Sequence, residues 1–260
     1  MASQTLDGPT PAAQAAELTP VGALTGVLLW PRRTFERLRE AERGHWWLVF
    51  VLALIVLVFN TVATVPVQVA VQQAVFEEQM GQLGDLPPEQ QAQIEQTQRI
   101  FSSTAMLSAI GTLTGIVGLV LGYAVRAGVL FLLGLALGGH ASFKQVWRMA
   151  VWATLPLVIG NLVGAVVVLA TGQFPAAGLT YIYTDAELAS VSPIVQSILG
   201  SIDLYVVWSL VLIAVGMAAT ARLSRAKSAG VAAAFWLLGT GLSAALAAAG
   251  QAVARAFGGG

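Results

Sequence analysis

Arg126 is the residue of this sequence whose chemistry stands out first, because it interrupts the apolar tract of residues 101–139. An ionisable side chain inside a membrane helix is costly and often functional. If the crossing comprises residues 116–137, the more apolar part of the tract, Arg126 lies near the bilayer midplane. Asn60, Asn161 and Ser209 then fall at a similar depth. We therefore predict an intramembrane polar layer of these four residues facing the bundle interior. If the crossing comprises residues 101–125 instead, Arg126 lies at the interface and snorkels to water.

Catalytic and metal-binding patterns are absent from the sequence. It has no cysteine, and its histidines, His45 and His140, have no nearby carboxylate pair. It contains no His-Glu-x-x-His, no phosphate-binding loop and no nucleophile elbow. We expect no catalytic residue, no metal and no cofactor, and thus no enzyme.

Three smaller features concern helix packing. Small residues at helical spacing permit close helix contact or a homodimer seam, and this stripe comprises Gly111, Gly115, Gly118 and Gly122. Asp203 is placed to cap the fourth crossing helix, and handling of a proton or cation is the alternative role. Pro156, with Asn161, is placed to kink the third crossing, as a packing feature or as the loosened backbone of a transporter.

Composition decides the fold class. The chain of 260 residues is 57% hydrophobic and 10% charged, with a mean hydropathy of +0.76, whereas soluble domains carry about 25% charged residues. The net charge is zero, which gives no reason to expect nucleic-acid binding. Asp, Glu, Lys and Arg are absent from five runs, which are residues 46–76, 100–125, 149–184, 204–221 and 228–254. Each approaches or exceeds the ~20 apolar residues that span a bilayer as a helix.

These runs predict an all-α polytopic bundle with five transmembrane helices. We expect a disordered tail at 1–20, without a cleaved secretory signal, a cytoplasmic interfacial segment at 21–45 and a membrane domain at 46–256. The crossings are expected at about 46–67, 101–138, 146–170, 199–221 and 229–253. We expect a short helical hairpin around Pro87 and Pro88, outside the membrane, to join the first two crossings. The tract 101–138 is expected to cross once, because a second crossing would put Lys144 and Arg148 on the wrong side of the membrane.

Residues 21–45 combine a short apolar stretch with a basic amphipathic one. Trp30, Phe35 and Leu38 share one helix face, and Pro31 suits a first turn. We predict a helix that lies in the membrane interface; an exposed basic stretch without a special role is the alternative. Its basic side chains are candidates for contact with anionic lipid, and they are Arg32, Arg33, Arg37, Arg39 and Arg43.

Basic residues of the loops fix the expected orientation. Eleven of the thirteen fall on one side of the membrane if Arg126 is counted there, and only Arg99 and Arg255 fall on the other. The N-terminus is therefore expected in the cytoplasm and the C-terminus outside.

Four motifs in order resemble the Yip family of Ypt/Rab-interacting membrane proteins, especially its prokaryotic branch. They are WPRRTFERL at 30–38, LGG with SFK at 137–144, ATLP at 153–156 and DLYVVW at 203–208. The residues that carry the resemblance are Pro31, Phe35, Gly138, Gly139, Pro156, Asp203 and Trp208. One departure is Trp152, where the family pattern leads us to expect tyrosine.

The resemblance implies a five-helix bundle with a cytoplasmic N-terminus. Eukaryotic members are associated with Rab GTPases, vesicle trafficking and membrane shaping, but only about twenty neutral residues precede the motif here, so Rab binding is not carried over. We expect a non-enzymatic scaffold, in a prokaryotic cytoplasmic membrane, that organises lipid, other membrane proteins or copies of itself. The alternatives are a transporter or channel component that uses the Arg126 layer, and an assembly partner of a membrane enzyme.

Overall fold

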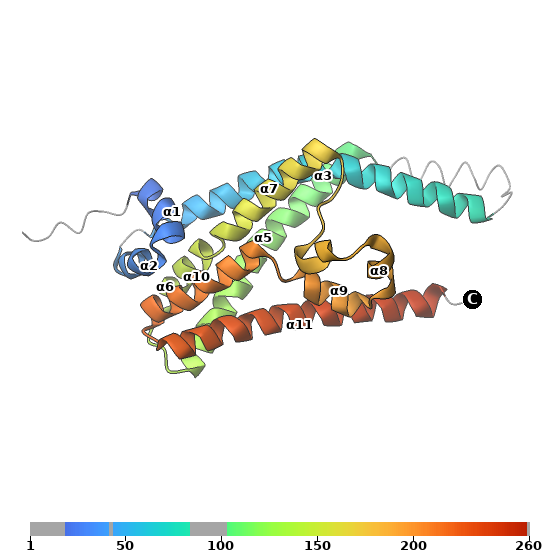
Figure 1. The fold of residues 1–260 in the computed structure, drawn as a ribbon. Coiled ribbons are helices and arrows are strands. Elements are labelled where there is room, and N and C mark those ends of the chain that lie inside the picture. Colours follow the sequence, from blue (N-terminus) through green and yellow to red (C-terminus); the bar gives the residue numbers. More distant parts are fainter. Residues whose placement is uncertain (1–18, 42–43, 84–102, 259–260) are drawn as a thin grey trace, which may run out of the picture.

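The computed structural model describes residues 19–41, 44–83 and 103–258 (Figure 1). The expected tail at 1–20 lies almost wholly outside these residues, as do Arg43, the hairpin around Pro87 and Pro88, and the first residues of the second expected crossing. The described residues form helices and no strand. The long elements are α3 (Trp46–Leu83), α5 (Thr104–Ala136), α10 (Leu204–Ala221), α11 (Arg225–Gly258) and the pair α6 (Phe143–Trp152) and α7 (Leu155–Thr171).

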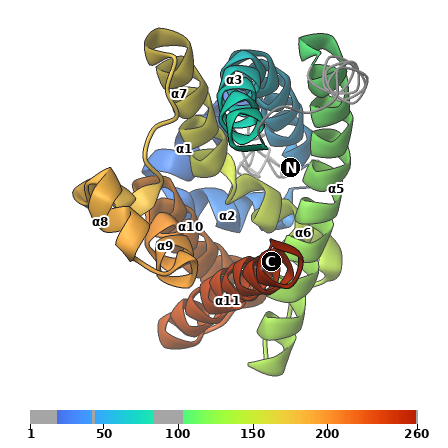
Figure 2. The same ribbon diagram turned by 90° about the vertical axis from the view of Figure 1, so that its right-hand side faces the viewer.

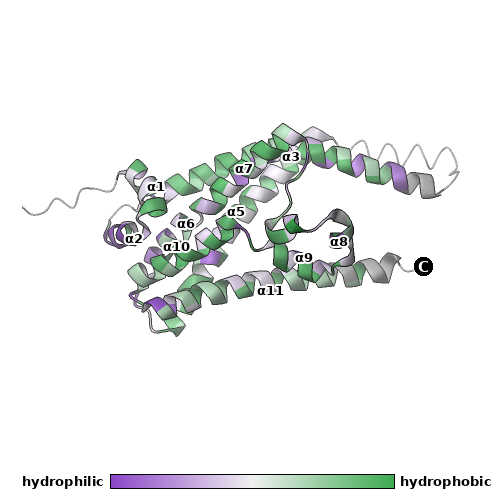
Figure 3. Ribbon diagram, viewed as in Figure 1, coloured by the Kyte–Doolittle hydropathy of each residue, from purple (hydrophilic) through white to green (hydrophobic). Residues whose placement is uncertain are grey.

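Five helical stretches of the described residues are long and apolar enough to cross a membrane, and α6 with α7 counts as one of them. The prediction of five crossings is therefore confirmed. Residues 104–136 form a single helix of 33 residues rather than two crossings. Many large apolar side chains of the crossing helices are exposed, as lipid contact requires. Hydrophobic residues predominate along these helices (Figure 3). In the end-on view α11 and α3 lie on opposite sides of the bundle (Figure 2).

A break divides the third crossing into α6 and α7, where the sequence predicted one helix with a kink. Pro156 lies in the first turn of α7, where its missing N–H and its fixed φ are tolerated. Ala153 and Thr154 form the junction, and the Thr154 hydroxyl donates to the carbonyl of Val151 at 2.6 Å. The proline therefore starts a new helix rather than bending a continuous one.

The fourth crossing begins later than the expected residue 199. Asp203 is the N-cap of α10, and its Oδ1 accepts a hydrogen bond from the backbone N–H of Val206 at 2.6 Å. The preceding residues form a separate short helix, α9 (Pro193–Gly200), which packs against α11. The 3₁₀ turn η1 (Gly178–Ile182) and α8 (Asp185–Ser190) complete the connection from α7.

The N-terminal segment folds onto the bundle as α1 (Pro20–Leu29) and α2 (Pro31–Glu40). Phe35 and Leu38 are buried, and α2 packs against α6 and α10, while Trp30 is 60% exposed. Thus the apolar face that the sequence assigned to the membrane interface is largely directed at protein, and Trp30 is not part of that buried face. The arginines occupy the other side of α2.

Backbone contacts join the turns at the end of the bundle that carries α2. Gly138 has a φ of +83°, and the N–H of Gly139 donates to the carbonyl of Gly134 at 2.8 Å. The side-chain Nζ of Lys227 donates to the carbonyl of Leu137 at 2.8 Å. The backbone N–H of His140 donates to the carbonyl of Ala221 at 3.0 Å. The glycine pair of the LGG motif thus closes α5 against α10 and α11.

Candidate functional site

Arg126 projects from α5 toward α10 and α11. Its Nη2 donates to Ser209 Oγ at 2.6 Å, and its guanidinium lies 5.1 Å from the ring centroid of Phe235. The Nε is buried and has no hydrogen-bond partner among the described residues. Among the described residues, the one ion pair between two side chains joins Arg32 and Glu36 in α2, at the surface. No carboxylate of the described residues therefore balances the charge of Arg126.

Ser209 connects Arg126 to the break in the third crossing. Its hydroxyl donates to the carbonyl of Ala153 at 2.7 Å while accepting from Arg126. The break leaves that carbonyl at the junction of two helices, and a buried carbonyl without a donor is costly in a bilayer. One serine thus satisfies the interrupted backbone and orients the guanidinium.

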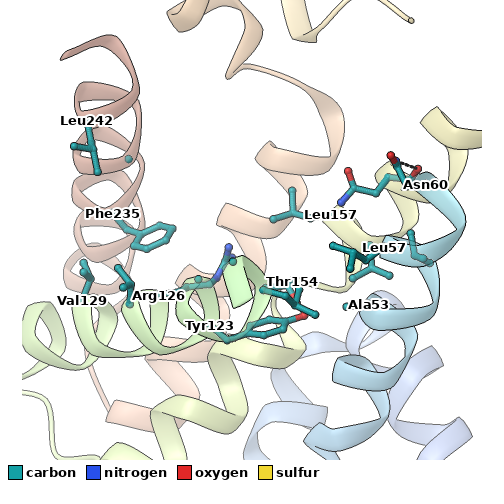
Figure 4. Close-up of a pocket in the computed structure, with 18 of the residues that line it drawn as sticks. Ala53, Leu57, Asn60, Tyr123, Arg126, Val129, Thr154, Leu157, Phe235 and Leu242 are labelled. Atoms are coloured by element: carbon teal, nitrogen blue, oxygen red, sulfur yellow. Dashed lines mark hydrogen bonds between the residues drawn. The ribbon is translucent and has the colours of Figure 1, made fainter. Parts of the chain in front are cut away.

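A cavity of about 660 Å³ opens beside Arg126 between α3, α5, α7 and α11 (Figure 4). Its walls are mostly apolar and include Leu57, Leu157 and Leu242. Arg126 lies ten residues before the end of α5 at Ala136, or about 15 Å along the axis at 1.5 Å per residue. This distance is about half of a ~30 Å hydrocarbon core. The depth of the guanidinium in the bilayer stays a prediction.

Asn60 and Asn161 line the same cavity on α3 and α7, away from the cation. Asn60 Nδ2 donates to the backbone carbonyl of Asn161 at 3.3 Å. Within the described part of the chain, no hydrogen bond joins either asparagine to Arg126 or Ser209. The four residues of the predicted layer therefore form two separate pairs, and Ser209 does not line the cavity. Their role as a functional layer stays a prediction.

Tyr123 and Thr154 also line the cavity, and sequence reasoning did not select them. Their hydroxyls lie 3.1 Å apart. Because Thr154 gives its proton to the carbonyl of Val151, Tyr123 must be the donor of this pair. A signal for both existed: Tyr123 is three residues before Arg126, on the same helix face, and Thr154 belongs to the ATLP motif.

The glycine stripe of α5 divides into two halves. Cβ atoms placed at Gly111 and Gly115 would meet α3, at 3.5 Å from Thr61 and 2.8 Å from Leu57. Cβ atoms at Gly118 and Gly122 would meet nothing within 4 Å, and both residues line the cavity. The first half thus brings α5 close to α3, and the second half leaves space.

The candidate lipid-contacting arginines lie on α2. Arg32, Arg33 and Arg37 are exposed and Arg39 is half-buried, whereas Arg43 lies outside the described residues.

Arg148, which the sequence placed among loop charges, is instead buried in α6 and donates to the carbonyl of Ala41 at 2.6 Å.

Trp152, the departure from the family pattern, is fully buried in α6. Its Nε1 donates to the carbonyl of Gly44 at 2.9 Å. Together with Arg148 it holds α6 against the segment that leads into α3. Tryptophan in place of the expected tyrosine thus keeps an aromatic ring with a hydrogen-bond donor at position 152.

The other motif residues have structural positions. Pro31 begins α2, Phe35 packs beside Met149 and Gly216, and Trp208 packs partly against the core. Among the described residues, no three His, Asp or Glu side chains gather as a metal site would require.

Comparison with known proteins gives one match. The family model described as the Yip1 domain matches residues 25–246. No curated protein matches, and no solved structure matches.

Ser209→Ala is expected to destabilise the bundle by about 1–2 kcal/mol, because it leaves the Ala153 carbonyl and a donor of Arg126 unpaired. The free energy of unfolding is measured by SDS titration in detergent micelles. Ser243→Ala, which removes an exposed hydroxyl of α11, is the matched control and should change it by less than about 0.5 kcal/mol. Equal values for the two variants would contradict the bridging role of Ser209.

Proposed function

The chain belongs to the Yip1 family, and from this premise we propose that it is a non-enzymatic scaffold that organises lipid or partner proteins in the membrane. Five membrane-spanning helices make it an integral membrane protein in contact with lipid. The scaffold role is supported by a surface rather than by a reactive centre. The exposed basic side chains at one end of the bundle form this surface, here called the basic face: Arg32, Arg33, Arg37, Lys144, Arg222, Arg225 and Lys227.

The single observation that carries the proposal is the way in which α2 is held. Its buried side chains, Thr34, Phe35 and Leu38, fix it to the bundle, so its exposed arginines have a defined place. A disordered basic tail would lose conformational entropy on binding a surface, and a helix already fixed to the bundle loses less. The basic face therefore suits anionic headgroups, to which each basic residue contributes roughly 1 kcal/mol.

We propose further that the basic face is cytoplasmic, as the distribution of lysine and arginine indicates. The N-terminus then lies inside and the C-terminus outside. The lipids that meet the basic face are those of the cytoplasmic leaflet.

A transporter or channel component is the second candidate, and the Arg126 cavity beside the broken third crossing favours it. Flux of protons or chloride through proteoliposomes tests this function. Under the scaffold proposal, flux equals that of protein-free vesicles. Flux above that level which Arg126→Ala abolishes would favour the transporter instead.

The orientation can be tested with single cysteines, because the chain has none of its own. We expect Tyr181→Cys, in η1 and 69% exposed, to react with a membrane-impermeant maleimide added to intact cells. Arg33→Cys in α2 should react only after the membrane is opened. The reverse pattern of labelling would overturn the orientation.

Replacing three arginines of the basic face should weaken anionic lipid binding. For Arg32→Gln, Arg33→Gln and Arg37→Gln combined, we expect a loss of about 3 kcal/mol, or roughly a hundredfold in relative affinity. Quenching of tryptophan fluorescence by brominated phosphatidylglycerol, compared with brominated phosphatidylcholine, reports this affinity in proteoliposomes. Trp30 and Trp47 are 60% and 51% exposed and serve as reporters.

Arg255→Gln, near the opposite end of α11, serves as the control for a general loss of positive charge. It should leave the preference for phosphatidylglycerol unchanged. High salt should reduce the preference of the unmodified protein, because exposed charges are screened. An unchanged preference in the triple variant would count against the basic face.

A further inference from the structure

The charge of Arg126 is the starting point, because no described acidic side chain neutralises it. A lone cation within a helix that spans the membrane is expensive to maintain. The hydroxyl of Ser209 and the ring of Phe235 stabilise the guanidinium, but neither carries a negative charge. A bound anion would complete the site.

The unoccupied donor points to the kind of anion. Nη2 is bonded to Ser209, whereas the Nε–H is buried and has no partner among the described residues. An Nε–H with a neighbouring Nη–H forms the planar fork that matches a carboxylate, with two parallel hydrogen bonds. One carboxylate also carries one negative charge, which would neutralise the positive charge of Arg126.

The cavity shows what must be attached to this carboxylate. Its volume of 660 Å³ lies within the roughly 300–1,000 Å³ of small-molecule sites. Leu57, Leu157, Leu238 and Leu242 line it, and these walls favour an alkyl chain over water. Figure 4 shows Arg126 beside Phe235 at one side of this space and Leu57 and Asn60 at the other.

Two glycines keep the cavity open. Side chains at Gly118 and Gly122 would point into free space rather than into a neighbouring helix. Close helix packing therefore does not account for these two positions, whereas it does account for Gly115. Because Gly118 and Gly122 have no side chains, the cavity beside Arg126 has room for a ligand.

We propose that the cavity binds one long-chain fatty acid, with its carboxylate on Arg126 and its alkyl chain along the apolar walls. The site is separate from the basic face, so the inference goes beyond the proposed function, and either can fail without the other. It gives the bundle a specific ligand between its helices, in addition to the lipids around it.

Binding of radiolabelled palmitate to the purified full-length chain in nanodiscs tests the proposal. We expect saturable binding of one palmitate per chain. Hexadecanol, which has the same chain length but no charge, should compete at least tenfold less well, and acetate should not compete. Competition by acetate equal to that by palmitate would overturn the proposal, because the site would then hold a small carboxylate from water.

Substitutions in α5 connect the binding to the cavity. Gly122→Leu fills the space and should weaken palmitate binding at least tenfold. Gly128→Leu is the matched control, because a Cβ there also meets nothing within 4 Å but the residue does not line the cavity. It should leave the affinity within a factor of two. Equal affinities for the two variants would overturn the site.

Arg126→Gln separates the charge from the space. It should remove the preference for palmitate over hexadecanol and leave hexadecanol binding in place. A retained preference would overturn the role of the guanidinium. Monodisperse elution on size exclusion shows that each variant is folded, and Gly122→Leu keeps Arg126 intact, so the proposal stays falsifiable if the glutamine variant does not fold.

Discussion

Hydrogen bonding of the backbone inside the bilayer is the constraint on which this structure depends. Lipid offers no donors or acceptors, so each interruption of a crossing helix needs an internal partner. The break before Pro156 is the main interruption, and two hydroxyls donate to the carbonyls beside it: Thr154 to Val151 and Ser209 to Ala153. The position of Arg126 follows from this arrangement, because Ser209 is its anchor.

Length and hydropathy were enough to predict the five crossings, because a charge-free run of helix length has few alternatives in a membrane. The sequence also indicated Asp203 as a cap and Pro156 as a disturbance, since both act on residues close by in the chain. It did not indicate that Pro156 would start a new helix. That outcome involves Ser209, which is more than fifty residues away in the chain and donates a hydrogen bond to the Ala153 carbonyl at the break.

The site was harder to predict than the fold. Equal depth placed Asn60, Asn161, Arg126 and Ser209 in one layer, and depth alone cannot show which residues touch. Rotation of each helix about its axis decides that, and it pairs the arginine with the serine and one asparagine with the other. The same limit applies to α2, because an amphipathic pattern does not show whether protein or lipid covers the apolar face of the helix. Tyr123 and Thr154 were missed because each is unremarkable alone.

The burial of Phe35 carries a consequence for synthesis of the chain. Phe35 lies near the start of the sequence, but its neighbours Met149 and Gly216 belong to the third and fourth crossings. A contact between residues so far apart in sequence forms late. During synthesis from the N-terminus, α2 is complete long before α10 is made, and its apolar face then has no protein partner. The nascent chain must therefore keep this helix on the membrane surface or on a chaperone until the fourth crossing has been inserted.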